Sequence, residues 1–455
     1  MFFSTREKKG IYNIILSSII IDIKKNFKID IKNSTIIKKK LSISFVVFTL
    51  KNLFLLNILI PNKIVNLKYR NCHIGRHILG SVYRDVSSHK NIFNLYFSLI
   101  KNYINAGLIV DHAYKLSNKI KIAYIDHSGY LNGLYFRVFA IKKKIIYTNN
   151  YPRGLFFINY SKKINKKINQ NSSALKLFKN NEVKIDYKKT ANFLKKIIKN
   201  PKIVPWMKST KMKKKFDDKF IKDYKSISHI IYAHSFTDGQ MWFGYDGFIN
   251  LKDWLIFTIQ ELKKTNNKII VKAHPNFFNK NLGEYAALDK KIFYRIKKKY
   301  ESDNIIFITE PIENNYLLNK ISKETILISH HGTALLEGLY SGFKCISSES
   351  TFWSSKFKVT NLWNSQKEYK KLLNRRFIDL KLPNKKDLYE VCYKLFLGPT
   401  SEYSEKYWYK IIKDQLKKKR WYSVMNSKME KKIDKKDFNL ICKKISKNIE
   451  EIQNN

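Results

Sequence analysis

Short apolar runs separated by polar turns dominate the second half of the chain. Runs with the length and composition of buried strands lie at residues 228–233, 268–273, 304–309, 325–329 and 343–347. Segments 254–264 and 333–341 instead have the apolar spacing of amphipathic helices, and Gly342 fits a left-handed C-cap after the second of them. Five strands, mostly separated by helices, predict a doubly wound parallel sheet.

The first half shows the same rhythm more weakly. Residues 121–125 and 144–147 have strand character, and residues 136–140 between them fit a short helix. This order of strand, helix and strand is that of a parallel βαβ unit. We therefore expect an α/β fold with two Rossmann-like parallel-sheet domains that face a cleft.

Breaks in this pattern suggest where the parts of the chain begin and end. The stretch 161–200 is periodic and rich in lysine, and it predicts a basic helical insert. Prolines at 201 and 205 and a lysine run at 211–215 mark a boundary after it. We expect an N-terminal α/β domain over 1–210, a C-terminal Rossmann-like domain over 211–390 and a basic helical tail over 391–455.

One segment, residues 41–60, has about the length that a membrane span requires. Lys51, Asn52 and Asn57 lie near its middle, and a central lysine is costly inside a bilayer. We interpret it as a buried helix or strand pair. The first residues lack the pattern of a signal peptide, so the expectation is a cytoplasmic protein, in peripheral contact at most with the anionic inner membrane.

Composition excludes several classes of protein. In 455 residues, 44% hydrophobic and 14% aromatic side chains are enough for two cores, which excludes a disordered chain. The cysteines have no CxxC spacing, so neither a disulfide scaffold nor a zinc ribbon is expected, and a reducing compartment is favoured. They are Cys72, Cys345, Cys392 and Cys442.

The net charge of +52 comes from 88 Lys and Arg against 36 Asp and Glu. Only ten of these basic residues are arginine, the residue that bidentate phosphate and base readers favour. Enrichment in Lys, Ile and Asn is typical of an AT-rich coding bias. We therefore expect no specific nucleic-acid partner, although a non-catalytic polyanion-binding protein remains an alternative.

Polar residues follow the predicted strands at their carboxyl ends, where open parallel sheets bind ligands. His274 and Pro275 come directly after one strand, and His274 can donate to a phosphate or only cap the turn. Another strand leads into a glycine turn and a helix, a sequence that suits phosphate binding, structural capping or, through its paired histidines, a metal. It contains Ser329, His330, His331, Gly332, Thr333 and, one turn later, Glu337, placed to reach ribose hydroxyls.

A third cluster, residues 234–248, follows another strand. It combines His234, Asp238 and Asp246 with hydroxyls and five aromatic residues, which suits a sugar site but also a packed aromatic loop. In the first half, Asp126 and His127 follow a predicted strand. A carboxylate there, or Asp238, could be the base or nucleophile of a glycosyl transfer. Glu310, at the end of a further strand, is a candidate for sugar or acceptor binding.

The His274-Pro275 element and the later turn into the helix bearing Glu337 resemble bacterial capsule-polysaccharide glycosyltransferases, over roughly residues 226–375. These are the capsule Kdo transferases and their relatives among CMP-sugar transferases, which share the GT-B architecture. The resemblance implies that His274, Pro275, Ser329, His330, Gly332 and Thr333 hold the nucleotide phosphates. Paired histidines stand where that family has a Ser-Ser or Gln-Ala-Ser element, so UDP- and GDP-sugars stay open.

The sequence thus predicts a glycosyltransferase that moves a sugar from a nucleotide donor, with a CMP-sugar favoured, to a growing capsule or surface polysaccharide. The expected partners are the nucleotide-sugar and a polysaccharide or lipid-linked glycan acceptor, without a metal or other cofactor. A teichoic-acid-type polyol-phosphate transferase and a nucleotide-sugar epimerase are the enzymatic alternatives.

Overall fold

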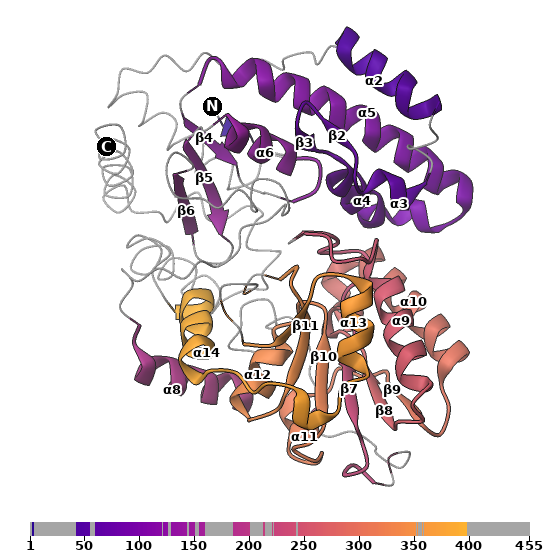
Figure 1. The fold of residues 1–455 in the computed structure, drawn as a ribbon, viewed down its shortest axis with the longest axis vertical. Coiled ribbons are helices and arrows are strands. Elements are labelled where there is room, and N and C mark those ends of the chain that lie inside the picture. The colour runs from indigo at the N-terminus through magenta and orange to yellow at the C-terminus, as the bar shows by residue number, and fades with distance from the viewer. Residues whose placement is uncertain are drawn as a thin grey trace.

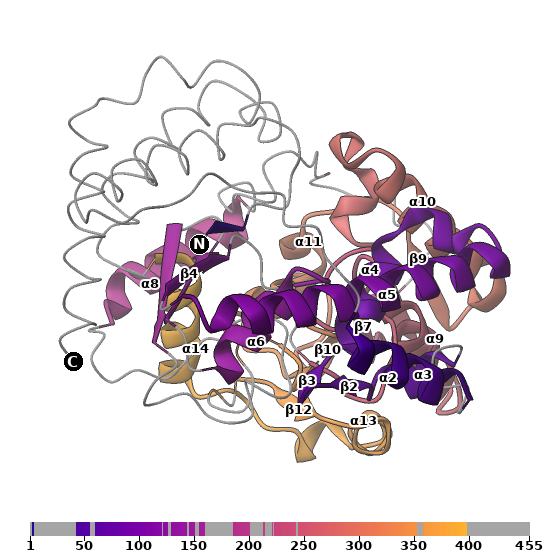
Figure 2. The same ribbon diagram turned by 90° about the horizontal axis from the view of Figure 1, so that it is seen from above.

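The computed structural model describes two α/β lobes, one above the other (Figure 1). Seen from above, the N-terminal helices lie over the C-terminal sheet (Figure 2). The described residues are 2–3, 42–54, 60–120, 122–125, 129–142, 145–150, 154–159, 185–200, 213, 221, 223–242, 244–351, 353, 357 and 359–397. Predictions for Asp126, His127, most of the insert at 161–200 and nearly all of the tail lie outside this set.

The C-terminal lobe is built on a parallel sheet of six strands in the order β12-β11-β10-β7-β8-β9. Along the chain, β7, β8 and β9 extend the sheet to one edge, and β10, β11 and β12 then extend it to the other. This is the doubly wound Rossmann order, and its switch point lies between β7 and β10. The strands are β7 (His229–Tyr232), β8 (Ile269–Lys272), β9 (Ile305–Ile308), β10 (Ile326–Ser329), β11 (Cys345–Ser348) and β12 (Asn361–Trp363).

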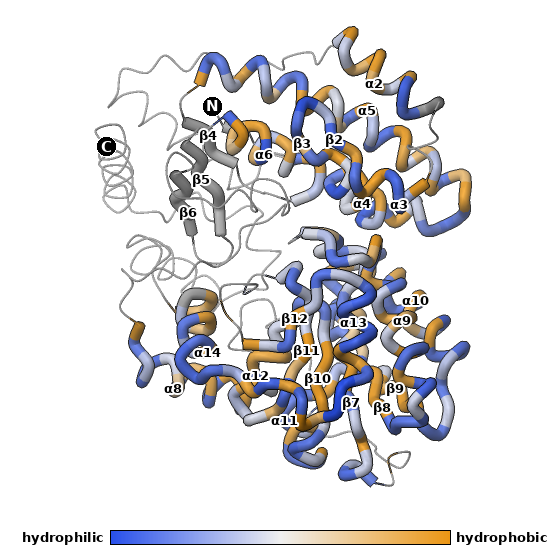
Figure 3. The backbone as a smooth tube through the Cα atoms, viewed as in Figure 1, coloured by the Kyte–Doolittle hydropathy of each residue, from blue (hydrophilic) through white to orange (hydrophobic). Residues whose placement is uncertain are grey.

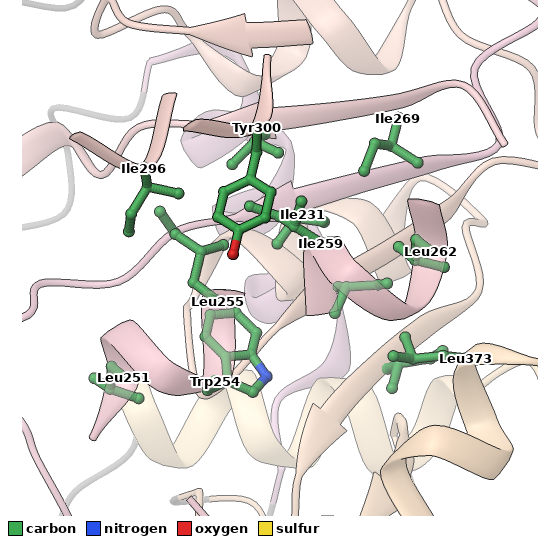
Figure 4. Packing of buried hydrophobic residues seen from close by; sticks show 14 of the residues in the cluster. Ile231, Leu251, Trp254, Leu255, Ile259, Leu262, Ile269, Ile296, Tyr300 and Leu373 are labelled. Atoms are coloured by element: carbon green, nitrogen blue, oxygen red, sulfur yellow. The ribbon is translucent and has the colours of Figure 1, made fainter. Parts of the chain in front are cut away.

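Helices cover both faces of this sheet because its strands are apolar on both sides. Ile231 and Ile269 pack against Trp254, Leu255 and other residues of the first layer (Figure 4). That layer contains α9 (Leu251–Lys263), α10 (Glu284–Tyr300) and α13 (Gln366–Leu373). The opposite layer contains α8 (Tyr187–Lys199), α11 (Asn314–Leu318), α12 (Ala334–Tyr340) and α14 (Lys385–Cys392).

The N-terminal lobe has a four-stranded sheet in the order β1-β4-β5-β6. Its strands β1 (Phe2–Phe3), β4 (Ile122–Ile125) and β5 (Ile145–Asn150) are parallel, whereas the edge strand β6 (Gly154–Asn159) runs antiparallel to β5. The short hairpin of β2 (Lys68–Tyr69) and β3 (Cys72–His73) forms a separate sheet. The helices of this lobe are α2 (Ile43–Phe54), α3 (Pro61–Ile64), α4 (Gly75–Arg84), α5 (Ile92–Ser117) and α6 (Gly133–Ile141).

Short helical turns complete the described structure. The 3-10 turns are η1 (Val86–His89), η4 (Pro275–Phe278), η5 (Lys280–Leu282) and η6 (Phe377–Asp379), and η7 (Tyr393–Leu397) is a π-helical turn.

The predicted α/β class and the doubly wound C-terminal sheet are confirmed. All five predicted strands of the second half are present, and Gly342 has the expected left-handed backbone, with φ of 85°. Strands β6 and β12 and the 26- and 17-residue helices α5 and α10 were not predicted. The N-terminal sheet is mixed rather than wholly parallel, because β6 returns beside β5 as a hairpin.

Two segments behave differently from their patterns. The prediction of a buried element over residues 41–60 holds only in part for α2: Phe45 is 1% exposed, but Ile43 and Leu50 are 85% and 62% exposed. No helix among the described residues is long and apolar enough to cross a membrane. Helix α8 belongs to the predicted N-terminal part, yet Leu194 lies in the core of the C-terminal lobe. The predicted boundary at residue 210 falls outside the described residues and stays a prediction.

Candidate functional site

Four histidines gather where the three central strands of the C-terminal sheet end. His234 follows β7, His274 follows β8, and His330 and His331 follow β10. The ring centroid of His234 lies 5.1 Å from that of His274 and 3.9 Å from that of His331. Because β7 lies between β8 and β10, residues from three distant segments meet beside the switch point.

His274 is fixed by the turn that its proline begins. Pro275 is the first residue of η4, and the His274 Nδ1 accepts a hydrogen bond of 3.2 Å from the backbone N–H of Asn276. In a neutral imidazole this leaves the proton on Nε2, which is then a donor. Burial, together with His234 and Lys272, lowers the pKa of His274 well below its usual value. His274 is therefore a neutral donor.

His330 and His331 form a hydrogen-bonded pair above a buried carboxylate. Their Nδ1 atoms lie 2.7 Å apart, and the His330 Nε2 lies 2.8 Å from Oδ2 of Asp246. Asp246 is 2% exposed and also accepts a hydrogen bond from the Ser348 hydroxyl. Burial alone would raise the pKa of Asp246, but His330 and Ser348 outweigh it and the pKa is lowered. Asp246 is therefore an ionised carboxylate that binds His330 and Ser348.

The turn that follows β10 is shaped by Ser329. Its hydroxyl donates to the carbonyl of Tyr232 at 3.3 Å and accepts from the backbone N–H of Gly332 at 3.2 Å. A Cβ on Gly332 would lie 2.6 Å from that hydroxyl oxygen, so packing on Ser329 explains the glycine. Thr333 occupies the N-cap position of α12 without a side-chain capping bond.

A buried lysine and glutamate lie beneath the histidines. Lys272 ends β8 and is 4% exposed, and burial lowers its pKa to about 8 although Glu337 opposes the shift. Burial raises the pKa of Glu337 to about 7, against the effects of Asn314 and Lys272. Lys272 and Glu337 can therefore both change their protonation state near neutral pH. Asn314 is itself held by the Tyr232 hydroxyl, which donates to its Oδ1 at 2.6 Å.

The loop after β7 is held by a buried acid that the sequence analysis missed. Asp289 of α10 accepts from the Ser235 hydroxyl at 2.6 Å and from the Phe236 backbone N–H at 3.0 Å. Burial raises the pKa of Asp289 to about 7. Asp289 lies in α10, a helix that was not predicted, and no motif around it marks it as buried.

The same loop makes the contact between the lobes. Asp238 binds Arg84 of α4 and the Tyr130 hydroxyl, and Tyr130 also stacks on Trp242 with centroids 6.1 Å apart. The Arg76 guanidinium lies 5.8 Å from the ring centroid of Tyr245. The sequence analysis missed Arg84, because no local motif marks it.

The remaining predicted residues are separate or undescribed. Glu310 forms an ion pair with Lys213, with Nζ and Oε1 2.7 Å apart, and does not join the histidines. Asp126 and His127 lie outside the described residues. Within the described part of the chain, no group of three or more His, Cys, Asp or Glu side chains is arranged to hold a metal ion.

No family model and no curated protein matches this sequence. Among solved structures, it is similar to Thermosulfurimonas dismutans KpsC, a beta Kdo 2,4 transferase, with 12% identity, a TM-score of 0.34 and coverage of 60% of this chain and 79% of that chain. It is also similar to Methanocaldococcus jannaschii UDP-GlcNAc 2-epimerase, in complex with UDP-GlcNAc and UDP. This likeness has 14% identity and a TM-score of 0.28, and it covers 64% of this chain and 81% of that chain. Likenesses of this size carry no argument about activity, which has to come from the residues of the site.

Proposed function

We propose that this protein is a GT-B-type glycosyltransferase that moves a sugar from a nucleotide-activated donor to a capsule or related surface polysaccharide. The observation that supports it best is the meeting of His234, His274 and His331 at the carboxyl ends of β7, β8 and β10. Rossmann-order sheets bind phosphate-bearing nucleotides at this place. The acceptor would be a polysaccharide or a lipid-linked glycan, and a CMP-sugar is the favoured donor.

The donor phosphate would be held mainly by His274. Its Nε2–H is a neutral donor that needs no counter-ion, and Lys272 supplies positive charge close by. Pro275 and the turn of Ser329, Gly332 and Thr333 would shape the same phosphate site, and Glu337 would approach the ribose hydroxyls. These assignments follow the resemblance to the capsule transferases at matching positions.

Sugar and acceptor would lie on the side of the N-terminal lobe. Asp238 comes from the C-terminal lobe but is bound to Arg84 and Tyr130 of the other lobe, so it stands where both substrates would meet. Asp238 or Asp126 would be the catalytic carboxylate. His127, His234 and Glu310 are the remaining candidates for sugar or acceptor contacts, while Asp246 would act through His330.

Thermal unfolding in the presence of CMP, CDP, UDP, GDP and a nucleic-acid oligomer tests this donor site. A nucleotide at about 100 times its dissociation constant should stabilise the protein by roughly 2.7 kcal/mol. We expect one nucleotide to stand out and His274→Ala to lose its effect. His229→Asn, at the opposite end of β7, is the matched control and should keep it.

Stabilisation by the oligomer alone, removed by salt, would instead identify a polyanion-binding protein. A nucleotide shift that survives in His274→Ala would remove His274 from the donor site.

A further inference from the structure

The hydrogen bonds around Asp246 determine which nitrogen of each paired histidine carries a proton. Asp246 is a carboxylate and can only accept, so the His330 Nε2 must carry the proton that it donates across 2.8 Å. In a neutral His330 the Nδ1 is then an acceptor. The contact of 2.7 Å between the two Nδ1 atoms therefore requires a proton on Nδ1 of His331. The neutral His331 must have its lone pair on Nε2.

The Nε2 atom that carries this lone pair lies against the loop that joins the lobes. A Cβ on Gly239 would lie 3.2 Å from the His331 Nε2 and 3.5 Å from Cε1 of His234. Gly239 has φ of 72°, and its backbone N–H donates to Asp238. The Nε2 of His331 thus lies among His234, Gly239 and the Asp238 loop, where the proposed acceptor would enter.

We propose that Asp246, His330 and His331 form a proton relay in which His331 is the general base and the positive charge comes to rest on His330. When His331 takes a proton at Nε2, it passes the bridging proton from its Nδ1 to Nδ1 of His330. His331 ends neutral as the opposite tautomer, and the imidazolium is His330, directly beside the Asp246 carboxylate.

The relay explains how a base can work in this place. Burial, with His234, His330 and His274 beside it, lowers the pKa of His331 well below its usual value, so a lasting charge there is unfavourable. His330 is flanked by Asp246 and by the rings of Trp254 and Trp363, with centroids 5.7 and 5.9 Å away. Moving one proton across the hydrogen bond between the two rings places the charge on His330, next to the Asp246 carboxylate.

For the substrate, this inference rests on the proposed function. In this scheme His331, rather than Asp238 or Asp126, is the base: the acceptor O–H bond breaks and its proton goes to Nε2 of His331. The oxygen's electron pair forms the bond to the anomeric carbon of the donor sugar. The bond from that carbon to the phosphate oxygen breaks, and its electron pair leaves with the nucleotide. Asp246 and His330 are positioning residues in this scheme, because they act only through His331.

Nitrogen-15 NMR of the full chain labelled at histidine tests the relay without any substrate. At high pH we expect His331 to carry its proton on Nδ1 and His330 on Nε2. Lowering the pH should change both rings in a single step, with His330 doubly protonated and His331 converted to the Nε2–H tautomer. The charged or titratable groups that face the pair are His234 and Asp238 after β7, His274 and Lys272 at β8, and Asp246.

Asp246→Asn removes the negative charge beside His330, so the coupled change of the two rings should need a lower pH than in the natural protein. The matched control is Asp289→Asn, a buried acid that binds Ser235 instead, and it should leave the midpoint close to that of the natural protein. An Nε2–H tautomer of His331 at high pH, or equal midpoints in the two variants, would overturn the relay. If Asp246→Asn does not fold, the spectrum of the natural protein alone decides.

The relay and the donor site fail separately. A correct tautomer pattern without any nucleotide stabilisation would leave the relay standing and remove the glycosyltransferase. Nucleotide stabilisation lost in His274→Ala, together with the wrong tautomer, would keep the donor site and remove the relay.

A second inference comes from the outer surface of the N-terminal lobe, on α2 and α5 (Figure 3). Phe93 and Phe97 on α5 are 80% and 71% exposed, and they continue as an apolar stripe at helical spacing through Ile100 and Ile104. On α2 the same spacing exposes Ile43, Val46, Val47 and Leu50. Phe45 packs from α2 onto Tyr103 of α5, so the two stripes belong to adjoining helices.

The charges around these stripes have one sign. Residues 42–120 contain two acids, Asp85 and Asp111, and both bind within the lobe, to Ser87 and to Arg70. The same residues contain ten basic side chains: Lys51, Lys63, Lys68, Arg70, Arg76, Arg84, Lys90, Lys101, Lys115 and Lys119. Lys51, Lys90 and Lys101 are exposed beside the apolar positions.

We infer that this face docks on an anionic lipid surface. Apolar side chains would enter the interface while the lysines contact the lipid phosphates, which is how amphipathic helices bind membranes without spanning them. The proposed lipid-linked acceptor would then reach the enzyme from the same surface.

Co-sedimentation of the full chain with vesicles tests this docking, using phosphatidylcholine alone and phosphatidylcholine mixed with phosphatidylglycerol. We expect binding to the anionic vesicles only, reduced by about tenfold or more in the double variant Phe93→Ser with Phe97→Ser. The double variant Ile378→Ser with Leu382→Ser removes two exposed apolar side chains from the other lobe and should bind normally.

Equal binding by both double variants would overturn the docking face. A dimer that the phenylalanine variant dissociates, without vesicle binding by the natural protein, would assign this face to a second copy of the chain and equally refute the lipid proposal.

Discussion

The positions of the site histidines could be predicted from the sequence, but their protonation could not. His234, His274, His330 and His331 were found because each follows a predicted strand, and strand ends meet at one edge of a parallel sheet. Their protonation was not predictable. The neutral state of His274 depends on its burial. The tautomers of His274 and of the His330–His331 pair depend on Asn276 and Asp246, partners that only the folded chain supplies.

His229 gives a residue-scale prediction about pH. It is 5% exposed at the start of β7, and burial lowers its pKa to about 4. The unfolded chain, with a pKa near 6.5, binds a proton between pH 6.5 and 4 that the folded chain does not bind. Stability is therefore highest above pH 6.5 and is lost as the pH falls, by about 3 kcal/mol from this residue.

His229→Asn keeps a polar atom beside Ser228 but cannot take up that proton. Urea unfolding from pH 7.5 to pH 4.5 should show a flatter decline in the variant than in the natural protein. Parallel declines would mean that His229 is charged in the folded state as well.

At the scale of elements, the parts predicted best are those with uninterrupted apolar runs. Strands β7, β8, β9 and β10 are buried on both faces, so short apolar runs centred on Ile, Leu and Val identified them. Strand β11, Cys-Ile-Ser-Ser, has a weaker run and was identified by its place after the predicted helix that ends before Gly342. Strand β12 is three residues long and only its last residue is buried, which leaves no apolar run to detect. Strand β6 was not predicted, and its antiparallel return beside β5 is known only from the fold.

Helix α2 shows how hydrophobicity alone misleads about burial. Its apolar residues predicted an interior element, yet Phe45 and Phe48 face α5 while Val47 and Leu50 face outward. A helix with apolar residues on more than one face is compatible with a core or with a second, external environment. The exposure of Val47 and Leu50 favours the second for α2.

At the scale of the whole molecule, the lobes are connected by contacts that no local pattern contains. Arg84 and Asp238 are 154 positions apart in the chain, and Arg76 reaches Tyr245 across the same junction. The sequence analysis placed Asp238 in a sugar site without its arginine partner. Long-range pairs of this kind follow from the packing of α4 on the β7 loop, so they could not be read before the fold was known.

The central claim is that this site transfers a sugar to an acceptor, and acceptor-dependent release of the nucleotide tests it most directly. The protein would be incubated with the nucleotide-sugar whose nucleotide stabilises it, with and without a polysaccharide or lipid-linked glycan acceptor. We predict that free nucleotide accumulates only when acceptor is present, and that His274→Ala abolishes it while His229→Asn does not. Conversion of the nucleotide-sugar without any acceptor would contradict the transferase and identify an epimerase.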